Sequence, residues 1–417
     1  MRQTISYATL VFLALSGCQG NEDNDGELPS AVAGQSSGGG AGDPGAAGQG
    51  GTGAGAGSAS AGTTQGGTAA TAGGEGGQGD PSGGTGPVVV NLPEGKGWLE
   101  LAGTELSSVC ACNDGFPEVC ANSGCGGIFS WSSGAYDSLR ERLIVFGGGH
   151  SDYFGNELYA LSLSDLTMTR LTDPGLPLAP DCAPSTAEGT QPSSRHTYDT
   201  LLYVEHADRL FVFGGSMPPC GYLSQDTWTY SFADQVWEPH EPSGPIPNAV
   251  PGIAGDYDPI SQKIFLHDDA ALYSYDLEQD AFELLLENDA IDYHLSGVID
   301  PVSRKLVLVG AGSVYTYDLD GDHTRVTLAT TGGDSIVGSS YPGLAYDADN
   351  ARIVAWNGGD SAFSLELESG EWTALTSPNG PGAANETGTY KRWRYVPGQS
   401  SFVLVNGPNQ NGYLFRL

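Results

Sequence analysis

The sequence predicts an all-β fold, a six-bladed β-propeller of four-stranded blades whose ring is closed by an N-terminal strand that pairs with the last blade. Three observations predict this fold. A hairpin pattern recurs six times, the last repeat lacks one strand, and the composition confines the globular region to residues 88–417.

The repeating unit begins with two strands joined by a polar turn, as in "YDSLRERLIVFGGG" and "YDADNARIVAWNGG". An aromatic or aliphatic residue ends the first strand, and a β-branched or aromatic run forms the second. Six such hairpins, spaced 42 to 67 residues apart, start at Tyr136, Tyr203, Tyr257, Ile299, Tyr346 and Tyr395. They predict the two inner strands of six blades.

A second pair of strands follows most of these hairpins, as in "DTWTYSFADQVWEPH" and "SAFSLELESGEWTAL". Aromatic and polar residues alternate, and a turn with Asp or Gly separates the two runs. Four strands in roughly 40 to 50 residues are typical of a propeller blade.

The two ends of the globular region complete each other. The last repeat stops at "GYLFRL" after three strands, and "GKGWLELAGTEL" from Gly95 to Leu106 supplies the fourth, with Trp98 placed as Trp372 is in "GEWTAL". This pairing removes sheet edges that would otherwise be exposed.

The glycine pairs of "VFGGG", "VFGGS" and "WNGG", together with Trp237 and Trp372 of the fourth strands, give a family resemblance. The region 88–417 resembles a kelch-type, galactose-oxidase-like propeller. Two blades depart from the pattern, because "FLHDDA" and "LVGAG" lack the glycine pair. In such propellers the second-to-third strand turns and the blade-to-blade linkers open on one face around the central channel.

The N-terminal region reads as an export signal and a tether. Arg2 and the apolar run "ISYATLVFLAL" lead to "LSGC", so residues 1–18 resemble a bacterial lipoprotein signal with Cys18 as the lipidated residue; an ordinary cleaved signal is the alternative. Residues 19–87 are rich in Gly, Ala, Ser and Thr and are expected to stay a coil. We therefore expect a monomer anchored in the bacterial cell envelope, at the outer membrane, which contacts the membrane through its lipid alone.

The net charge of -34, from 16 Lys and Arg against 50 Asp and Glu, argues against some partners. Nucleic acid and anionic lipid headgroups would be repelled, so we expect no nucleic-acid partner. Any local cluster of Arg or Lys becomes conspicuous.

Six cysteines remain once Cys18 is set aside, and an even number in an exported protein indicates disulfides. Cys182 is expected to pair with Cys220, whereas the pairing among Cys110, Cys112, Cys120 and Cys125 stays open. No histidine lies near this second group, which argues against a metal knuckle.

We expect no metal and no cofactor. A galactose-oxidase-like copper site would need a cysteine crosslinked to a tyrosine, and the cysteines are better explained as disulfides. A zinc or calcium site from His150, His196 and His294 is a weaker alternative, because the three come from different blades.

Polar residues are predicted to converge on the channel mouth from different blades. His150 and Tyr153 lie in the second-to-third strand turn of the first blade, and His267 in that of the third. The other residues open innermost strands: Arg195 and His196 of "PSSRHTYD", His294 of "DYHLSG", Tyr341, and Arg392 and Arg394 of "GTYKRWRYVP". Each of these residues singly is more often a hydrogen-bonded loop residue than a functional one, so the argument depends on their coincidence.

A basic, His- and Tyr-lined cup on an acidic protein suits an anionic ligand, for which an acidic (uronate) polysaccharide is the expected example. Arg195, Arg392, Arg394, His267, His294 and Tyr341 would bind it. If it is cleaved by β-elimination, His150 or His196 would remove the proton and Tyr153 would protonate the leaving oxygen. A polysaccharide lyase and a non-catalytic glycan- or protein-binding module are the two leading alternatives.

A chain that starts at Val88 is expected to fold with the melting temperature of the longer chain, because residues 19–87 have too little apolar surface to join a core. Thermal unfolding followed by circular dichroism measures this. Failure of the shorter chain to fold, while the longer one folds, would contradict the domain boundary.

Overall fold

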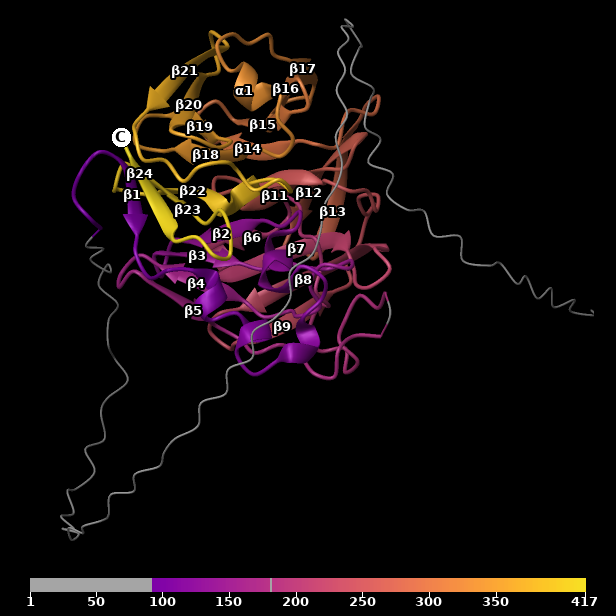
Figure 1. Ribbon diagram of the computed structural model, residues 1–417. Helices are drawn as coiled ribbons and strands as arrows, with labels where there is room; N and C mark the ends of the chain where they lie inside the picture. The colour runs from indigo at the N-terminus through magenta and orange to yellow at the C-terminus, as the bar shows by residue number, and fades with distance from the viewer. Residues whose placement is uncertain (1–91, 181) are drawn as a thin grey trace, which may run out of the picture. The chain divides into compact units, whose positions relative to one another are not determined.

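Six antiparallel four-stranded sheets are arranged in a ring in the computed structural model, which describes residues 92–180 and 182–417 (Figure 1). The predicted six-bladed propeller is thereby confirmed. Cys18, the signal and the linker lie outside the described residues and stay predictions.

The strands are given for each blade from the channel outward. Blade 1 has β2 (Gly134–Asp137), β3 (Arg142–Val145), β4 (Tyr159–Ser162) and β5 (Thr167–Arg170). Blade 2 has β6 (Leu202–Val204), β7 (Arg209–Ser216), β8 (Leu223–Ser231) and β9 (Val236–His240). Blade 3 has β10 (Ala254–Asp258), β11 (Lys263–His267), β12 (Ala271–Asp276) and β13 (Ala281–Glu287).

Blade 4 has β14 (Ser296–Asp300), β15 (Lys305–Gly310), β16 (Ser313–Asp318) and β17 (Arg325–Thr327). Blade 5 has β18 (Gly343–Asp347), β19 (Arg352–Trp356), β20 (Ser361–Glu366) and β21 (Glu371–Thr376). Blade 6 has β22 (Trp393–Val396), β23 (Ser401–Leu404), β24 (Gly412–Arg416) and, as its outermost strand, β1 (Gly97–Leu101).

Short helical turns occupy the connections. Before blade 1 these are η1 (Leu106–Ser108), η2 (Ala111–Asn113), η3 (Pro117–Val119) and η4 (Gly124–Phe129); elsewhere they are η5 (Glu205–Ala207), α1 (Asp334–Val337) and η6 (Tyr390–Arg392). Within the described ranges, no helix has the length and apolar character needed to cross a membrane.

The first hairpin turn of several blades is set by an aspartate at the end of the innermost strand. The carboxylate of Asp258 accepts hydrogen bonds from the backbone N–H groups of Ile260 and Ser261, and Asp300 does the same in blade 4. Aspartate favours turns because its side chain can replace a backbone acceptor in this way.

The ring closes through β1, as the sequence predicts. β1 pairs antiparallel with β24 from Gly97 opposite Arg416 to Leu101 opposite Gly412. Trp98, the second residue of β1, is 6% exposed. Its ring lies 5.8 Å from that of Trp393 and 4.8 Å from that of Phe415, and its Nε1–H donates to the carbonyl of Asp360 in blade 5.

Trp98→Ala is expected to lower the free energy of unfolding by about 3 to 5 kcal/mol, because it leaves a cavity where the Trp98 ring packs β1 against blade 6. Val302→Ala, at a side chain that is 72% exposed, is the control and should change it by less than about 0.5 kcal/mol. Chemical denaturation measures both. Equal midpoints for the two variants would show that closure does not depend on Trp98.

Candidate functional site

Each innermost strand runs from the face formed by the blade-to-blade linkers, here the linker face, to the face formed by the first hairpin turns, the hairpin face. One residue per blade lies five positions before the residue that begins each hairpin repeat. These six positions, the mouth ring, are Trp131, Tyr198, Gly252, His294, Tyr341 and Tyr390. Five of the six carry an aromatic or imidazole ring, on the linker face.

The backbone of the mouth ring is unusual. Trp131, Tyr198, Tyr341 and Tyr390 have φ values of 43°, 44°, 51° and 48°, in the left-handed region. Bulky residues seldom adopt this conformation, which costs of order 1 to 3 kcal/mol each and is concentrated at functional sites. Recurrence at equivalent positions of four blades indicates a requirement for rings at this mouth.

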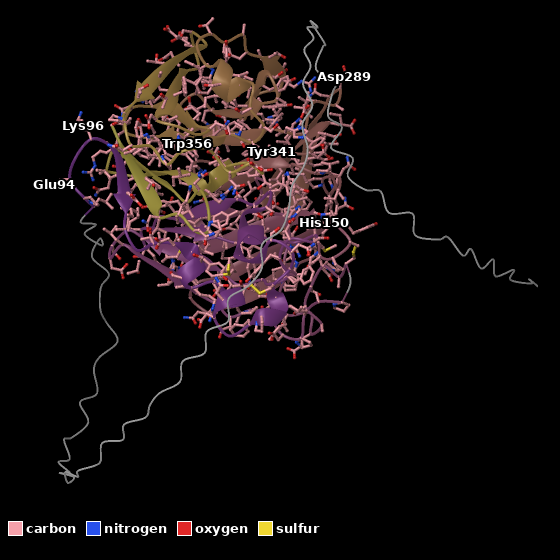
Figure 2. All side chains as sticks on the ribbon, in the orientation of Figure 1. Glu94, Lys96, His150, Asp289, Tyr341 and Trp356 are labelled. Atoms are coloured by element: carbon pink, nitrogen blue, oxygen red, sulfur yellow. A yellow bond between two sulfur atoms is a disulfide. The ribbon has the colours of Figure 1, made fainter. Side chains whose placement is uncertain are left out.

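The tyrosines of the ring form its floor. Tyr198, Tyr341 and Tyr390 are at most 7% exposed and pack with Trp131. The rings of Tyr341 and Tyr390 are stacked with centroids 4.7 Å apart. Figure 2 labels Tyr341 and His150, which lie on this part of the molecule.

At one edge of the mouth, His150 and His196 lie close together with Asp152 in a histidine–aspartate cluster. His196 Nε2 lies 3.0 Å from Asp152 Oδ2, and the ring centroids of His150 and His196 are 6.1 Å apart. Burial would raise the pKa of Asp152, but the contacts with His196, Ser123 and His150 together outweigh burial, and the pKa lies below its usual value. His196 is buried, whereas His150 is partly exposed.

The glycines before His150 allow a close approach of chains. Gly149 has φ 78°, and a Cβ there would lie 2.2 Å from the carbonyl oxygen of Ser216 in blade 2. His150 itself is left-handed, with φ 42°, and Gly221 leaves room for its ring. The glycine triplet thus allows this turn to pack closely against blade 2.

At the opposite edge, His294 and its neighbour Tyr293 form a partly exposed pair. Their rings are stacked with centroids 4.1 Å apart, and His294 lies 5.1 Å from Tyr341. His294 Nδ1 is 2.6 Å from Asp292 Oδ1. Tyr293 is 40% exposed, so this edge can be reached from solvent.

Arg195 does not face the mouth, contrary to the expectation that it binds a ligand. It is fully buried. Its guanidinium donates to the carbonyls of Ser193, Gly214 and Pro184 and to Asp226 Oδ1, at 2.6 to 3.1 Å. These bonds satisfy loop carbonyls that would otherwise be buried without a donor.

Arg392 is also fully buried and has a structural rather than a ligand-binding position. It donates to the carbonyls of Ser132, Asn406 and Gly388, and its guanidinium carbon lies 4.9 Å from the ring centre of Phe129. Burial lowers its pKa to about 9, which still leaves it charged at neutral pH. Arg392 ties the linker before blade 1 to blade 6.

A groove of about 500 Å³ lies between the linker before blade 1 and two loops of blades 5 and 6, the segments that Arg392 connects. Seven of its thirteen lining residues carry an amide or hydroxyl side chain and Glu386 adds a carboxylate; the lining is Ser123, Gly126, Ser130, Ala383, Ala384, Asn385, Glu386, Thr387, Asn406, Gly407, Pro408, Asn409 and Gln410. Ser130 precedes Trp131 in the chain, so the groove adjoins the mouth ring.

The groove is held in shape by its own side chains. Asn406 Nδ2 donates to the carbonyl of Ala383 and to Gln410 Oε1, and Thr387 Oγ1 donates to the carbonyl of Phe129. The sequence prediction missed this groove. Its signal was present in two asparagine-bearing stretches on the linker face, "GAANETG" and "NGPNQNG".

Tyr153 is placed differently from the prediction that it protonates a leaving group. It is 1% exposed, and its hydroxyl donates to Glu157, which also accepts from Tyr159 at 2.5 Å. Burial raises the pKa of Glu157. This apolar setting beneath the linker before blade 1 holds Tyr153 away from the mouth.

Two further predicted ligand contacts lie elsewhere. His267 is 2% exposed and shares a hydrogen bond of 2.7 Å with the hydroxyl of Tyr317, between blades 3 and 4. Arg394 directly precedes Tyr395, the residue that begins the sixth hairpin repeat. It therefore lines a cavity on the hairpin face and not the mouth on the linker face. Burial of His267, at the end of β11, depends on packing between blades that the sequence does not show. The repeat position of Arg394, directly before Tyr395, already indicated the hairpin face.

The structure pairs all six cysteines of the globular region. Cys110 is joined to Cys125, Cys112 to Cys120 and Cys182 to Cys220, with sulfur atoms drawn in yellow in Figure 2. The first two disulfides fasten the linker that forms one wall of the groove. The third joins two loops near His150, since a Cβ added to Gly221 would lie 2.8 Å from Cδ2 of that ring.

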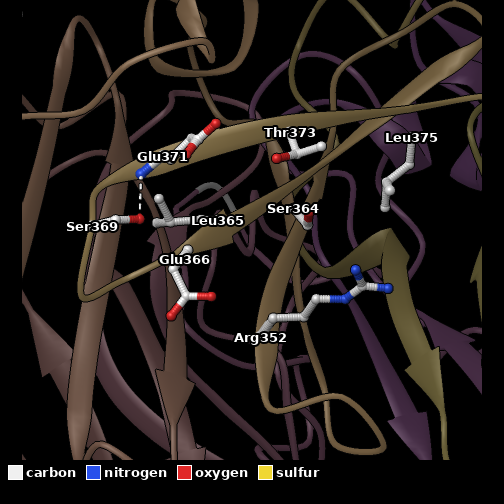
Figure 3. A pocket seen from close by; sticks show the side chains of 8 residues that line it. All are labelled: Arg352, Ser364, Leu365, Glu366, Ser369, Glu371, Thr373 and Leu375. Carbon is white, nitrogen blue, oxygen red and sulfur yellow. Dashed lines mark hydrogen bonds between the residues drawn. The ribbon is translucent and has the colours of Figure 1, made fainter.

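A second groove lies on the outer strands of blade 5, away from the mouth (Figure 3). Arg352, Glu366 and Glu371 are among its lining residues. The Nε of Arg352 is bonded to Asp347, so its charge is already paired. The histidine cluster and the amide groove are therefore the better candidates.

Across residues 92–180 and 182–417, no three His, Cys, Asp or Glu side chains are grouped so that they could hold a metal ion. No protein-family model matches the chain, and no curated protein matches it. The kelch resemblance therefore stays a prediction within the confirmed propeller fold.

His267 predicts a pH dependence of stability. Burial lowers its pKa from 6.5 to about 4, with Asp268 and Arg325 acting in opposite directions. Between these values the unfolded chain binds a proton that the folded chain refuses, so stability is lost as the pH falls. Wild type should lose about 2 to 3 kcal/mol more than His267→Gln between pH 7 and pH 4.5.

Chemical denaturation at both pH values measures this difference. Glutamine can still accept the hydrogen bond from Tyr317 but does not titrate, which makes it the matched variant. Equal losses for the two proteins would mean that His267 titrates normally in the folded state.

Proposed function

We propose that this protein is an exported propeller that binds a glycan on its linker face. The observation that supports this most strongly is the amide- and hydroxyl-lined groove directly beside the mouth ring. The groove volume falls in the range of small-ligand sites.

The chemistry of the two neighbouring surfaces is complementary to a sugar. Asparagine and glutamine amides offer both donors and acceptors, which match sugar hydroxyls. Trp131, His294 and Tyr293 present partly exposed rings, which can pack on the apolar face of a sugar ring. A saccharide that lies in the groove with one unit over Trp131 would use both.

The charge of the preferred glycan follows from the positions of Arg195 and Arg392. Both guanidinium groups are buried and bonded to protein acceptors. Recognition of a uronate by these residues, which the sequence suggested, thereby loses its support. We favour a neutral saccharide in this groove.

The cellular setting of the proposal comes from the sequence alone. The lipoprotein-like signal with Cys18 and the long Gly-rich segment suggest a tethered module at the cell envelope, where external polysaccharides are encountered. The kelch-like repeat is consistent with a binding module.

A lyase that cleaves an acidic polysaccharide is the second candidate, and the His150–Asp152–His196 cluster favours it. The Asp152 carboxylate contacts His196, as an orienting group contacts a general base. Against it, Tyr153 is buried on Glu157 and cannot serve as the general acid.

Trp131→Ala is expected to weaken binding of an oligosaccharide at least tenfold, because Trp at the centre of a binding surface carries a large share of the affinity. Calorimetric titration against neutral and uronate oligosaccharides measures it. Val326→Ala, at a side chain that is 50% exposed on β17, is the control and should bind as wild type does. Failure of every saccharide to bind, or equal binding by both variants, would contradict the proposal.

The lyase alternative is distinguished by ultraviolet absorbance. β-Elimination leaves a conjugated, unsaturated product, whereas binding leaves none. The binding proposal expects no increase in absorbance with uronate polysaccharides. An increase that His150→Ala abolishes would favour the lyase instead.

A further inference from the structure

A separate cavity of about 290 Å³ lies at the other end of the channel, on the hairpin face. Residues from all six innermost strands line it. Its wall is the set of residues that begin the hairpin repeats, here called the tyrosine ring: Tyr136, Tyr203, Tyr257, Ile299, Tyr346 and Tyr395. Exposed turn residues such as Pro259, Ala348 and Pro397 form its rim.

Several hydroxyls of the tyrosine ring are already engaged with the turns. Tyr136 donates to Glu141, Tyr203 donates to Asp208 at 2.9 Å, and Tyr257 shares a hydrogen bond of 2.8 Å with His206. The bonded hydroxyls fix the orientation of these rings. The hydroxyls of Tyr346 and Tyr395 are buried and have no hydrogen-bond partner, so the cavity offers a ligand polar groups as well as aromatic surface.

Arg394 supplies the strongest polar feature of the cavity. Its Nη1 is buried and has no hydrogen-bond partner. Its Nη2 lies 3.7 Å from Asp256 Oδ1, on the blade opposite, which is too long for a hydrogen bond. The other Asp256 oxygen accepts the backbone N–H of Ile299 at 3.1 Å.

Other buried side-chain atoms of the described residues also have no hydrogen-bond partner, but among the arginines described Arg394 alone is in this state. The other arginine side chains described each donate at least one hydrogen bond, for example Arg304 to Asp258 and Asp320, and Arg195 to four acceptors. Buried donors in proteins are nearly always paired, and an exception needs an explanation. A bound ligand that accepts a hydrogen bond from Arg394 would explain it.

We propose that this cavity is a second binding site, distinct from the glycan groove, for a small ligand that bears a carboxylate. The planar guanidinium fork of Arg394 matches a carboxylate. The tyrosine ring would pack against the body of the ligand.

The charges around Arg394 shape the selectivity of the site. Asp256 and Glu205 also line the cavity, so a ligand with several negative charges would be repelled. One carboxylate satisfies the open edge of the guanidinium while Asp256 keeps its bond to Ile299. A monoacid of the size of one sugar or one amino acid fits the volume.

Two sources offer this chemistry, a uronic acid and the C-terminal carboxylate of a peptide. Calorimetric titration with D-galacturonate and with N-acetylphenylalanine represents them. D-Galactose and N-acetylphenylalaninamide are the neutral counterparts. We expect at least one acid to bind at least tenfold more tightly than its neutral counterpart.

Arg394→Met should weaken that acid at least tenfold, because it removes the charge but keeps most of the side chain. Ala348→Trp, at an exposed rim position, should also block it while leaving Arg394 and Asp256 unchanged. Ala348→Ser is the matched control and should bind as wild type does. The rim variants keep the test valid if Arg394→Met fails to fold.

Binding of galacturonate alone identifies a sugar acid, and binding of N-acetylphenylalanine alone identifies a peptide terminus. Binding of neither acid up to about 10 mM, or binding unchanged in both Arg394→Met and Ala348→Trp, would overturn the proposal. Galacturonate binding that is lost in Trp131→Ala but kept in Arg394→Met would assign it to the glycan groove and likewise overturn it.

Discussion

The ion pair between Lys391 and Asp199 is the interaction on which the centre of this propeller depends. Nζ of Lys391 lies 2.8 Å from Asp199 Oδ2 and 2.7 Å from the carbonyl oxygen of Gly297, and both side chains are at most 1% exposed. Asp199 Oδ2 also accepts the backbone N–H groups of Gly255 and Gly297. One buried pair thus links chain segments of blades 2, 3, 4 and 6. Burial raises the pKa of Asp199 to about 6 in spite of Lys391. Removal of either partner would leave an uncompensated buried charge and destabilise the fold.

This pair lies between the mouth ring and the tyrosine ring along the innermost strands, since Asp199 follows Tyr198 and Lys391 follows Tyr390. Glycines in the innermost strands let the blades approach closely: a Cβ on Gly297 would lie 2.9 Å from the backbone nitrogen of Gly255. Above the pair, the tyrosines of the mouth ring pack together; below it, the tyrosine ring surrounds the cavity with Arg394. The two faces can therefore carry different sites, each built on one residue per blade.

Buried cations in this protein serve the architecture before they serve a ligand. Arg195 donates to the loop carbonyls of Ser193 and Pro184, and Arg392 to those of Ser132 and Asn406, which is how irregular connections can be buried beside a channel. Arg394 differs because its neighbours are strands whose backbone groups are already paired in the sheets. An arginine has a structural role here where unpaired backbone carbonyls surround it, and it is open to a ligand where no such acceptor is left.

The fold could be predicted from the sequence, because period-two alternation and turn residues repeat locally in each blade, and because the missing strand of the last repeat had an evident replacement around Trp98. The sequence also placed His150, His196, His294 and Tyr341 at one mouth from their positions in the repeat. Which side chains are available there depends on contacts between distant segments. Burial and hydrogen bonding of Arg195, Arg392 and Tyr153 depend on loops from other blades, and such contacts leave no periodic signal in the chain.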